Sequence, residues 1–145
     1  MGAPAVLSAG CNRQVSFQRM LRFLGWLFAV GFMLFVAGAA GEAAVARALA
    51  EELRSIGLTV EIQEVAPGRP NVVGTLEGAA PGRSLMYCGH IDTVGVSGMT
   101  RPFDPAERDG RIYGRGSQDM KSGVAAMIGA ARVLAESGGL ATGRL

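Results

Sequence analysis

The sequence has little of two residue types that carry chemistry in proteins, because its 145 residues contain one histidine and two cysteines. Cys11 and Cys88 are too few and too differently placed for the disulfide framework of a small secreted protein. We interpret Cys88, which ends an apolar run, as a buried thiol in a strand. The single histidine, His90, is a candidate functional residue only if its neighbours support it.

The sequence also lacks the features of a nucleic-acid-binding protein. Its formal net charge is only +2, and residues 1–41 hold three arginines and no acidic residue. The remaining residues carry eleven basic and twelve acidic side chains, so they are close to neutral. The sequence contains neither a stripe of basic residues nor a regular series of aromatic residues on which bases could stack. We therefore expect no nucleic-acid partner.

Charge is absent from one long segment, Phe23 to Gly41, which follows Arg13, Arg19 and Arg22. A basic start, an apolar middle and small residues at the end are typical of an export signal, and the length reaches the ~20 residues that span a bilayer. If residues 13–41 are a genuine signal or anchor, the protein is exported or membrane-anchored. A misplaced start or an altered reading frame would produce a similar segment. The sequence leaves both interpretations open, so we treat residues 1–41 separately from residues 42–145.

The remaining residues alternate between helical and extended patterns. Apolar residues recur every three or four positions from Glu42 to Ile56, which predicts an amphipathic helix that ends at Gly57. A second helix is predicted from about Met120 to Ser137. Strands are predicted at Leu58–Val65, Asn71–Leu76, Leu85–Cys88, Arg111–Tyr113 and Leu140–Leu145, with a turn at Gly78–Gly82. This order predicts an α/β fold whose sheet has a mixed edge.

The strand predicted at Leu85–Cys88 is uncharged, which indicates burial on both faces. Residues two apart in a strand point the same way, so His90 and Asp92 are expected side by side at its carboxyl end. Open α/β sheets place their chemistry at this end. A carboxylate beside a histidine can receive the ring N–H that faces away from a metal ion. We therefore predict that Asp92 orients His90.

A second carboxylate, Asp119, follows the glycine-rich stretch Gly114 to Gln118 and precedes the second predicted helix. Asp119 is a candidate metal ligand, although an Asp at a helix start is more often an N-cap. Gly114 and Gly116 do not match a phosphate-binding loop, because a glutamine and an acid stand where a further glycine is needed. Arg115 and Lys121 are interpreted as structural or solvated side chains.

Three motifs together resemble one enzyme family. They are Gly-His-Ile-Asp-Thr-Val, then Pro-Phe-Asp-Pro, then Asp-Gly-Arg-Ile-Tyr-Gly-Arg-Gly-Ser-Gln-Asp-Met-Lys-Ser-Gly. In this order and spacing they resemble the zinc amidohydrolase and exopeptidase family that includes acetylornithine deacetylase, succinyl-diaminopimelate desuccinylase, aminoacylase-1 and carboxypeptidase G. The resemblance extends from about Gly41 to Leu145.

The resemblance implies a function and a site. It implies the amino-terminal part of a mixed-sheet, zinc-exopeptidase-like catalytic domain that is incomplete here. By the same resemblance His90 binds one metal ion, Asp119 bridges two, and Asp92 is the catalytic residue that orients His90. The cofactor is expected to be two zinc ions for each full-length active site, with cobalt as a possible replacement.

The resemblance also implies a substrate and a setting. The substrate is expected to be a small N-acyl amino acid or a peptide, and the full-length proteins of the family are expected to be cytoplasmic homodimers. The family's paired glutamates and later metal ligands have no counterpart after Asp119, where the only acid is Glu136. We therefore expect the chain alone to be inactive. A membrane-tethered or exported module without catalytic activity, supported only by Phe23 to Gly41, is the alternative.

Overall fold

The computed structural model describes residues 41–145. The possible signal, anchor or artefact at Phe23 to Gly41 therefore lies outside the described residues, apart from Gly41 itself. In residues 41–145 no helix is long and apolar enough to cross a membrane. Two α-helices, one π-helical turn and three pairs of strands make up the described chain, one pair parallel and two antiparallel. The prediction of an α/β fold is confirmed.

The first described helix, α2, spans Glu42–Ser55, as the apolar periodicity predicted. Its inner side contributes Val45, Ala46, Leu49 and Ala50 to the core, all of them buried. Gly57 ends the helix with a φ of +89°, a conformation that glycine adopts without steric cost. Glu42 lies in the first turn and Arg54 in the last, so both charges complement the helix dipole.

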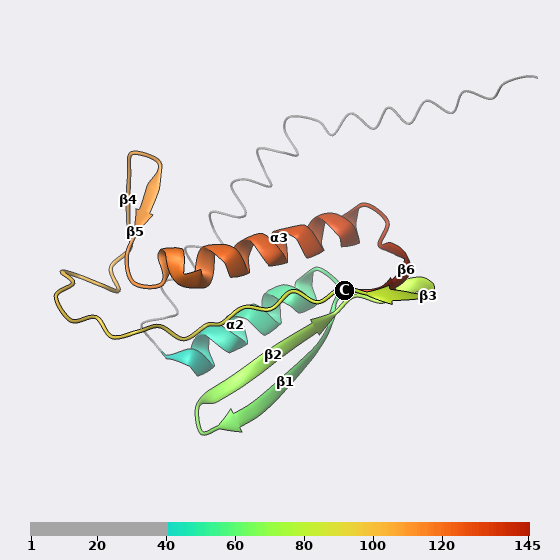
Figure 1. Ribbon diagram of the computed structural model, residues 1–145, viewed down its shortest axis with the longest axis horizontal. Helices are drawn as coiled ribbons and strands as arrows, with labels where there is room; N and C mark the ends of the chain where they lie inside the picture. The colour runs from blue at the N-terminus through green and yellow to red at the C-terminus, as the bar shows by residue number, and fades with distance from the viewer. Residues whose placement is uncertain (1–40) are drawn as a thin grey trace, which may run out of the picture.

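The next two strands form an antiparallel hairpin that packs against α2 (Figure 1). They are β1, Thr59–Ala66, and β2, Arg69–Thr75, and the bounds predicted from the sequence differ from these by at most two residues. The hairpin is covered near the start of β1, where the preceding residue Leu58 is buried. Val65 at the other end is exposed, so the far part of the hairpin extends into solvent.

A third strand, β3, spans Gly78–Ser84, where the sequence predicted a turn. It pairs in parallel with β6, Leu140–Arg144, which was predicted. The glycines that suggested a turn instead allow two main chains to approach, because a Cβ built on Gly82 would lie 2.7 Å from the Gly143 nitrogen. Glycine inside a strand therefore marks a close backbone approach here.

The strand predicted at Leu85–Cys88 is not formed in the described chain. The pairing of β3 with β6 ends where the Leu85 N–H donates to the Arg144 carbonyl, 3.0 Å away. The residues that follow Leu85 have no strand structure. Leu85 is 58% exposed and Met86 is 82% exposed, and Cys88 is also exposed. The predictions of a doubly buried strand and of a buried Cys88 thiol are therefore wrong for this structure. Among residues 41–145, no strand pairs with residues 86–88.

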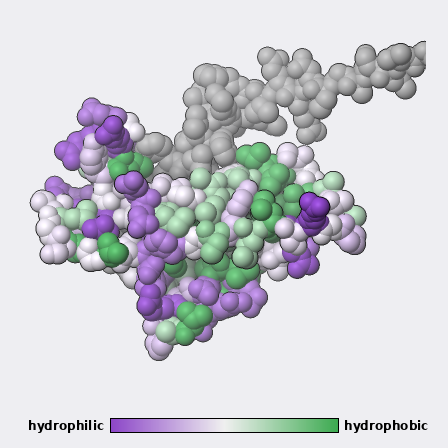
Figure 2. Space-filling view, viewed as in Figure 1, coloured by the Kyte–Doolittle hydropathy of each residue, from purple (hydrophilic) through white to green (hydrophobic). Residues whose placement is uncertain are grey.

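A short hairpin projects from the rest of the chain (Figure 1). It consists of β4, Ala106–Arg108, which the sequence analysis missed, and β5, Arg111–Tyr113, which it predicted. The turn is made by Asp109 and Gly110, both at positive φ. Figure 2 shows polar side chains over this hairpin, whereas apolar side chains lie over the long C-terminal helix.

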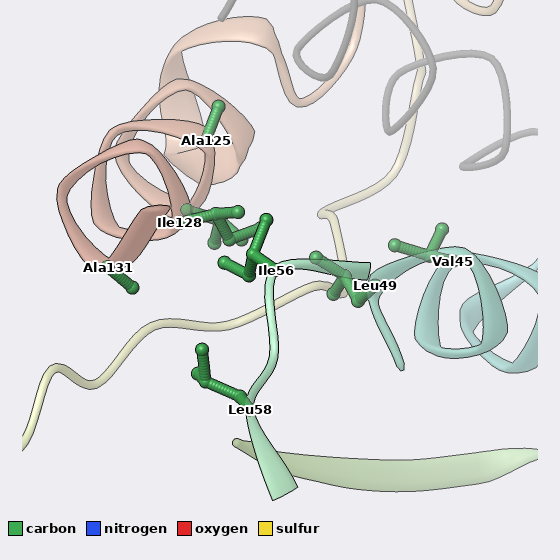
Figure 3. Packing of buried hydrophobic residues seen from close by; sticks show 8 residues of the cluster. Val45, Leu49, Ile56, Leu58, Ala125, Ile128 and Ala131 are labelled. Carbon is green, nitrogen blue, oxygen red and sulfur yellow. The ribbon is translucent and has the colours of Figure 1, made fainter. Parts of the chain in front are cut away.

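That helix, α3, spans Ser122–Glu136 and follows one π-helical turn, η1, at Ser117–Lys121. Its inner side contributes Ala125 and Ile128 to the core, whereas Met127 is only partly buried. Figure 3 shows Ile128 next to Ile56, with Leu49 of α2 nearby. The Arg132 guanidinium also pairs with the Glu52 carboxylate of α2. Apolar packing and one ion pair therefore join the two helices.

Candidate metal centre

Two side chains from distant parts of the sequence meet at the start of α3. The His90 Nε2 lies 3.1 Å from the Asp119 Oδ1, although 29 positions separate the two residues. Their side chains are 47% and 73% exposed, so an ion can reach them from solvent. The structure therefore places the two predicted metal ligands together; that they bind metal stays a prediction.

Asp92 contacts the opposite side of the same imidazole. Its Oδ1 lies 3.1 Å from the His90 Nδ1, and its main-chain oxygen lies 3.3 Å from that nitrogen. The two residues stand side by side in a non-regular segment and not at the end of a strand, which corrects the geometry that the sequence suggested. With Nδ1–H donating to Asp92, the lone pair of Nε2 faces Asp119.

Asp119 does not cap the helix. The residue at the N-cap position of α3 is Lys121, that of η1 is Gly116, and neither helix start carries a side-chain capping hydrogen bond. The interpretation of Asp119 as a plain N-cap is therefore wrong. The residue before η1, Gly116, is left-handed with a φ of +83°. The peptide bond between Asp119 and Met120 is cis.

Arg69, at the start of β2, holds the second oxygen of Asp92. Its Nη2 lies 3.4 Å from the Asp92 Oδ2, while its Nε donates to the Glu42 carboxylate at 2.9 Å. The hydrogen bond and the charge of Glu42 raise the pKa of Arg69, and Asp92 adds to this effect. Asp92 is therefore fixed between His90 and an arginine from the hairpin.

Charge controls the protonation of His90. Partial removal from water lowers the pKa of His90, but the hydrogen bonds to Asp92 and Asp119 and the charges of both carboxylates outweigh this effect. The pKa of His90 therefore lies above its ordinary value. Protons consequently compete with a metal ion for Nε2 over a wider pH range than at an isolated histidine.

Lys121 is buried beside the candidate metal centre. It is only 2% exposed, so the interpretation as a solvated side chain is wrong, whereas a structural role agrees with its contacts. Its Nζ donates to the Ile91 carbonyl at 3.2 Å. Burial lowers the pKa of Lys121, and the negative charge of Asp92 partly opposes this. No motif indicated this burial; the one sequence signal is that a lysine stands directly before an apolar helix.

Arg115, interpreted together with Lys121, also has a structural contact. Its Nη2 donates to the Gly95 carbonyl at 3.0 Å, and its main-chain N–H donates to the Pro102 carbonyl at 2.8 Å. Arg115 thus fixes the loop that leads from Asp92 to the β4–β5 hairpin. Neither basic residue points toward a phosphate-binding function.

The donor set fits the binding of a metal ion such as zinc only in part. An imidazole nitrogen and a carboxylate oxygen that converge are ordinary zinc ligands, and the second ring nitrogen is held by a carboxylate, as is common for zinc-bound histidines. A zinc ion takes about four ligands. Within residues 41–145, however, no group of three or more His, Cys, Asp or Glu side chains is arranged to hold a metal ion. The described chain supplies two donors and their support.

A cavity of about 590 Å³ lies beside the site. His90 and Asp92 form part of its wall, and apolar side chains of α2, β2 and α3, including Leu49, Val73 and Ile128, form much of the rest. Asp119 does not line it. His90 and Asp92 therefore adjoin this apolar space, whereas Asp119 does not.

Comparison with known proteins agrees with the resemblance found in the motifs. Residues 86–145 match Peptidase family M20/M25/M40. This segment contains His90, Asp92 and Asp119, so the three candidate site residues all lie within the match. The match begins just after β3 and includes the whole of α3.

Curated proteins of known name match over a longer part of the chain. An N-formyl-4-amino-5-aminomethyl-2-methylpyrimidine deformylase of Bacillus subtilis is 37% identical over 95 residues, which cover 61% of this chain and 22% of the relative. A succinyl-diaminopimelate desuccinylase of Paracidovorax citrulli is 37% identical over 90 residues, covering 55% and 23%. An acetylornithine deacetylase of Photorhabdus laumondii is 44% identical over 89 residues, covering 58% and 23%. The chain thus spans about a quarter of the length of these relatives.

Proposed function

We propose that this chain belongs to Peptidase family M20/M25/M40 and forms part of a metal-dependent hydrolase, because its residues 86–145 match that family. The bond cleaved is the amide of an N-acyl amino acid or of a dipeptide-like molecule. The observation that carries the proposal is the 3.1 Å approach of the His90 Nε2 to the Asp119 Oδ1. Two such donors from separate segments supply the first ligands of a metal centre.

The metal ions proposed are two zinc ions, with cobalt as a replacement. When bound, zinc polarises a carbonyl group and lowers the pKa of water, which is the chemistry that amide hydrolysis requires. His90 would contribute Nε2 to one ion, and Asp119 would contribute carboxylate oxygens. The remaining ligands of a two-zinc centre would come from residues other than these two, since each ion takes about four.

Asp92 acts on His90 and not on the substrate in this proposal. Its carboxylate accepts the Nδ1–H, so the neutral imidazole keeps its lone pair on Nε2 and its ring plane is fixed. Arg69 holds the other carboxylate oxygen, which limits rotation of the Asp92 side chain. Loss of Asp92 would therefore weaken metal binding at His90 without removing a ligand.

The relatives suggest the class of substrate. Their names describe the removal of a formyl, a succinyl and an acetyl group. These groups differ in size and charge, but all three are acyl groups. We propose that this chain serves the same kind of reaction, the release of an acyl group from a nitrogen atom by water.

We further propose that the 145-residue chain does not hydrolyse amides by itself. The described residues bring together one histidine and one aspartate as ligands, and the nearby Asp92 carboxylate is already held by His90 and Arg69. A general base must lie within hydrogen-bond reach of the attacking water. Catalysis by the purified chain would contradict this part of the proposal.

Zinc titration followed by calorimetry tests the metal site. We expect the chain to bind one zinc ion, and Asp119→Asn or His90→Gln to weaken binding by about tenfold or more because each removes a ligand. Asp109→Asn is the matched control, since Asp109 is an exposed aspartate at positive φ in the β4–β5 turn, where asparagine is well tolerated. Equal affinity of the wild-type and Asp119→Asn proteins would overturn the proposed site.

A further inference from the structure

One charged side chain is buried among the described residues, and it is Lys121. The sequence contains thirteen arginines and this single lysine. A buried ammonium group is costly unless it is hydrogen-bonded. Lys121 meets this need with a main-chain oxygen, because its Nζ donates to the carbonyl of Ile91. Ile91 is the residue between His90 and Asp92.

The contact joins the two halves of the candidate metal centre. At one end is the carbonyl of Ile91, next to His90; at the other end is the main chain of Lys121, two residues after Asp119. The Lys121 main-chain N–H donates to the Gly116 carbonyl at 3.0 Å, which fixes the turn that carries Asp119. One side chain thus spans from the turn of Asp119 to the segment of His90.

The surroundings leave the lysine little freedom to move. A Cβ built on Gly116 would lie 2.9 Å from the Lys121 Nζ and 2.9 Å from a methyl group of Thr93. On the other side of His90, a Cβ built on Gly89 would lie 3.2 Å from both Met120 and Val124. The segment of His90 therefore packs closely on the start of α3, and the ammonium group is enclosed between main-chain atoms.

We propose that Lys121 is a positioning residue that sets the separation between His90 and Asp119 by holding the Ile91 carbonyl from within the protein. The inference rests on the proposed function, because it assigns Lys121 to the metal site of that function. Lys121 neither binds the metal nor contacts the substrate. It fixes the main chain between His90 and Asp92, so that both ring nitrogens meet their carboxylates.

A purely structural lysine would give a different result from a positioning lysine. A structural role predicts that removing the ammonium group lowers the free energy of unfolding and leaves the folded site unchanged. A positioning role predicts that the imidazole of His90 changes its hydrogen bonding even in protein that stays folded. His90 is the only histidine in the sequence, so histidine labelled with ¹⁵N reports this site alone.

The first experiment uses the unaltered chain without metal. Lysine labelled with ¹⁵N gives one side-chain signal, since Lys121 is the only lysine. We expect the ammonium protons to exchange with water at least about tenfold more slowly than those of free lysine, because the group is enclosed and hydrogen-bonded. Exchange as fast as in free lysine would overturn the inference, and this result does not depend on any variant folding.

The second experiment compares variants by the ¹⁵N shifts of the His90 ring in metal-free protein, above the pKa of His90. Lys121→Met keeps the apolar stem but removes the ammonium group, so we expect the ring to move toward the mixed tautomers of a free imidazole. Lys121→Arg, which keeps a cationic donor, should lie nearer to the wild type. Ile128→Val on the same helix is the control for a small loss of core packing and should leave the ring shifts unchanged. Unchanged ring shifts in folded Lys121→Met would overturn the inference.

Zinc affinity then separates the inference from the proposed function. If the unaltered chain binds zinc, we expect Lys121→Met to weaken binding by about tenfold or more, as loss of a residue that orients a ligand does. Wild-type zinc affinity in folded Lys121→Met would count against the inference. If the unaltered chain binds no zinc, the proposed metal site fails, while the ring shifts of His90 in metal-free protein still decide the role of Lys121.

Discussion

The core between the two helices and the segment that carries His90 are held in place by different forces. In the core, Leu49 and Ile56 pack against Ile128 of α3, all of them buried (Figure 3). The segment of residues 85–104 is largely exposed and has no regular secondary structure. Two basic side chains fix it by donating to main-chain carbonyls, Lys121 to Ile91 and Arg115 to Gly95.

This difference indicates how each region responds to change. Apolar burial has no preferred direction and depends mainly on the area removed from water, so a core can tolerate small shifts. A hydrogen bond depends on distance and angle, so a segment held by a few of them loses its geometry when one is removed. Substitutions in the core should therefore change stability, and substitutions around the segment should change the site.

The largest effect is expected from the core. Ile128→Ala removes a buried side chain of α3 and should lower the free energy of unfolding by about 2–4 kcal/mol, because it leaves a cavity between the helices. Urea unfolding followed by circular dichroism measures this change. The ring shifts of His90 in the folded variant should stay as in the wild type. An Ile128→Ala protein with wild-type stability but altered His90 ring shifts would contradict the expectation that core substitutions change stability and not the site.

Gly116→Ala should lower the free energy of unfolding less than Ile128→Ala does, but it should disturb the His90 site more. The new methyl group would meet the Lys121 Nζ and Thr93, and Gly116 has a φ of +83°, so we expect a loss of about 1–2 kcal/mol together with a shifted His90 ring. Gly110→Ala is the matched control, because Gly110 also has positive φ but has open space around it. If both variants shift the His90 ring equally, the contact with Lys121 does not set the site.

The third prediction concerns the pH dependence of stability, which should arise from His90 at the site and not from the apolar core. The folded-state pKa of His90 is raised above its ordinary value of about 6.5. The protonated ring therefore stabilises the metal-free chain fully below about pH 6.5, and this contribution is lost as pH rises through the folded-state pKa. Asp119→Asn should lower the pKa of His90, as followed by ¹⁵N shifts, and should lower stability at about pH 5.5 more than at about pH 9. Asp109→Asn should do neither.

The smallest effect on stability is expected from the exposed apolar residues of the segment. Leu85→Ser with Met86→Ser should change the free energy of unfolding by less than about 0.5 kcal/mol, because both side chains are largely in solvent. The same change should reduce self-association, which exposed apolar side chains and unpaired strand edges promote. Size-exclusion chromatography of both proteins measures this. A wild-type chain that runs as a clean monomer would contradict the prediction.

The parts of the fold that could be predicted are those that depend on neighbours in the sequence. Helix α2 follows from the spacing of Val45, Leu49 and Ile56, and its end follows from Gly57. The hairpin β1–β2 follows from alternation and from the turn residues between its strands. Local periodicity is set by the geometry of each element, so the sequence alone carries it.

The parts that could not be predicted depend on distant segments. Strand β3 has a sequence rich in glycine and alanine, and only its partner β6 makes it a strand. The run from Leu85 to Cys88 has the composition of a buried strand, but burial requires a covering layer that the described residues do not provide. The approach of His90 to Asp119 was expected from a resemblance of motifs, since no periodicity relates the two residues. The burial of Lys121 had no pattern to indicate it.

The parallel pairing of β3 with β6 has a consequence for the way the chain is made. A ribosome synthesises Gly78–Ser84 long before Leu140–Arg144, and the hairpin β4–β5 and the whole of α3 emerge between them. During that interval β3 has no partner in the described chain, whereas α2 and the β1–β2 hairpin already have the local contacts that they need. The nascent protein therefore carries an open strand edge until its last described strand appears, and chaperone contacts with this edge are expected in that window.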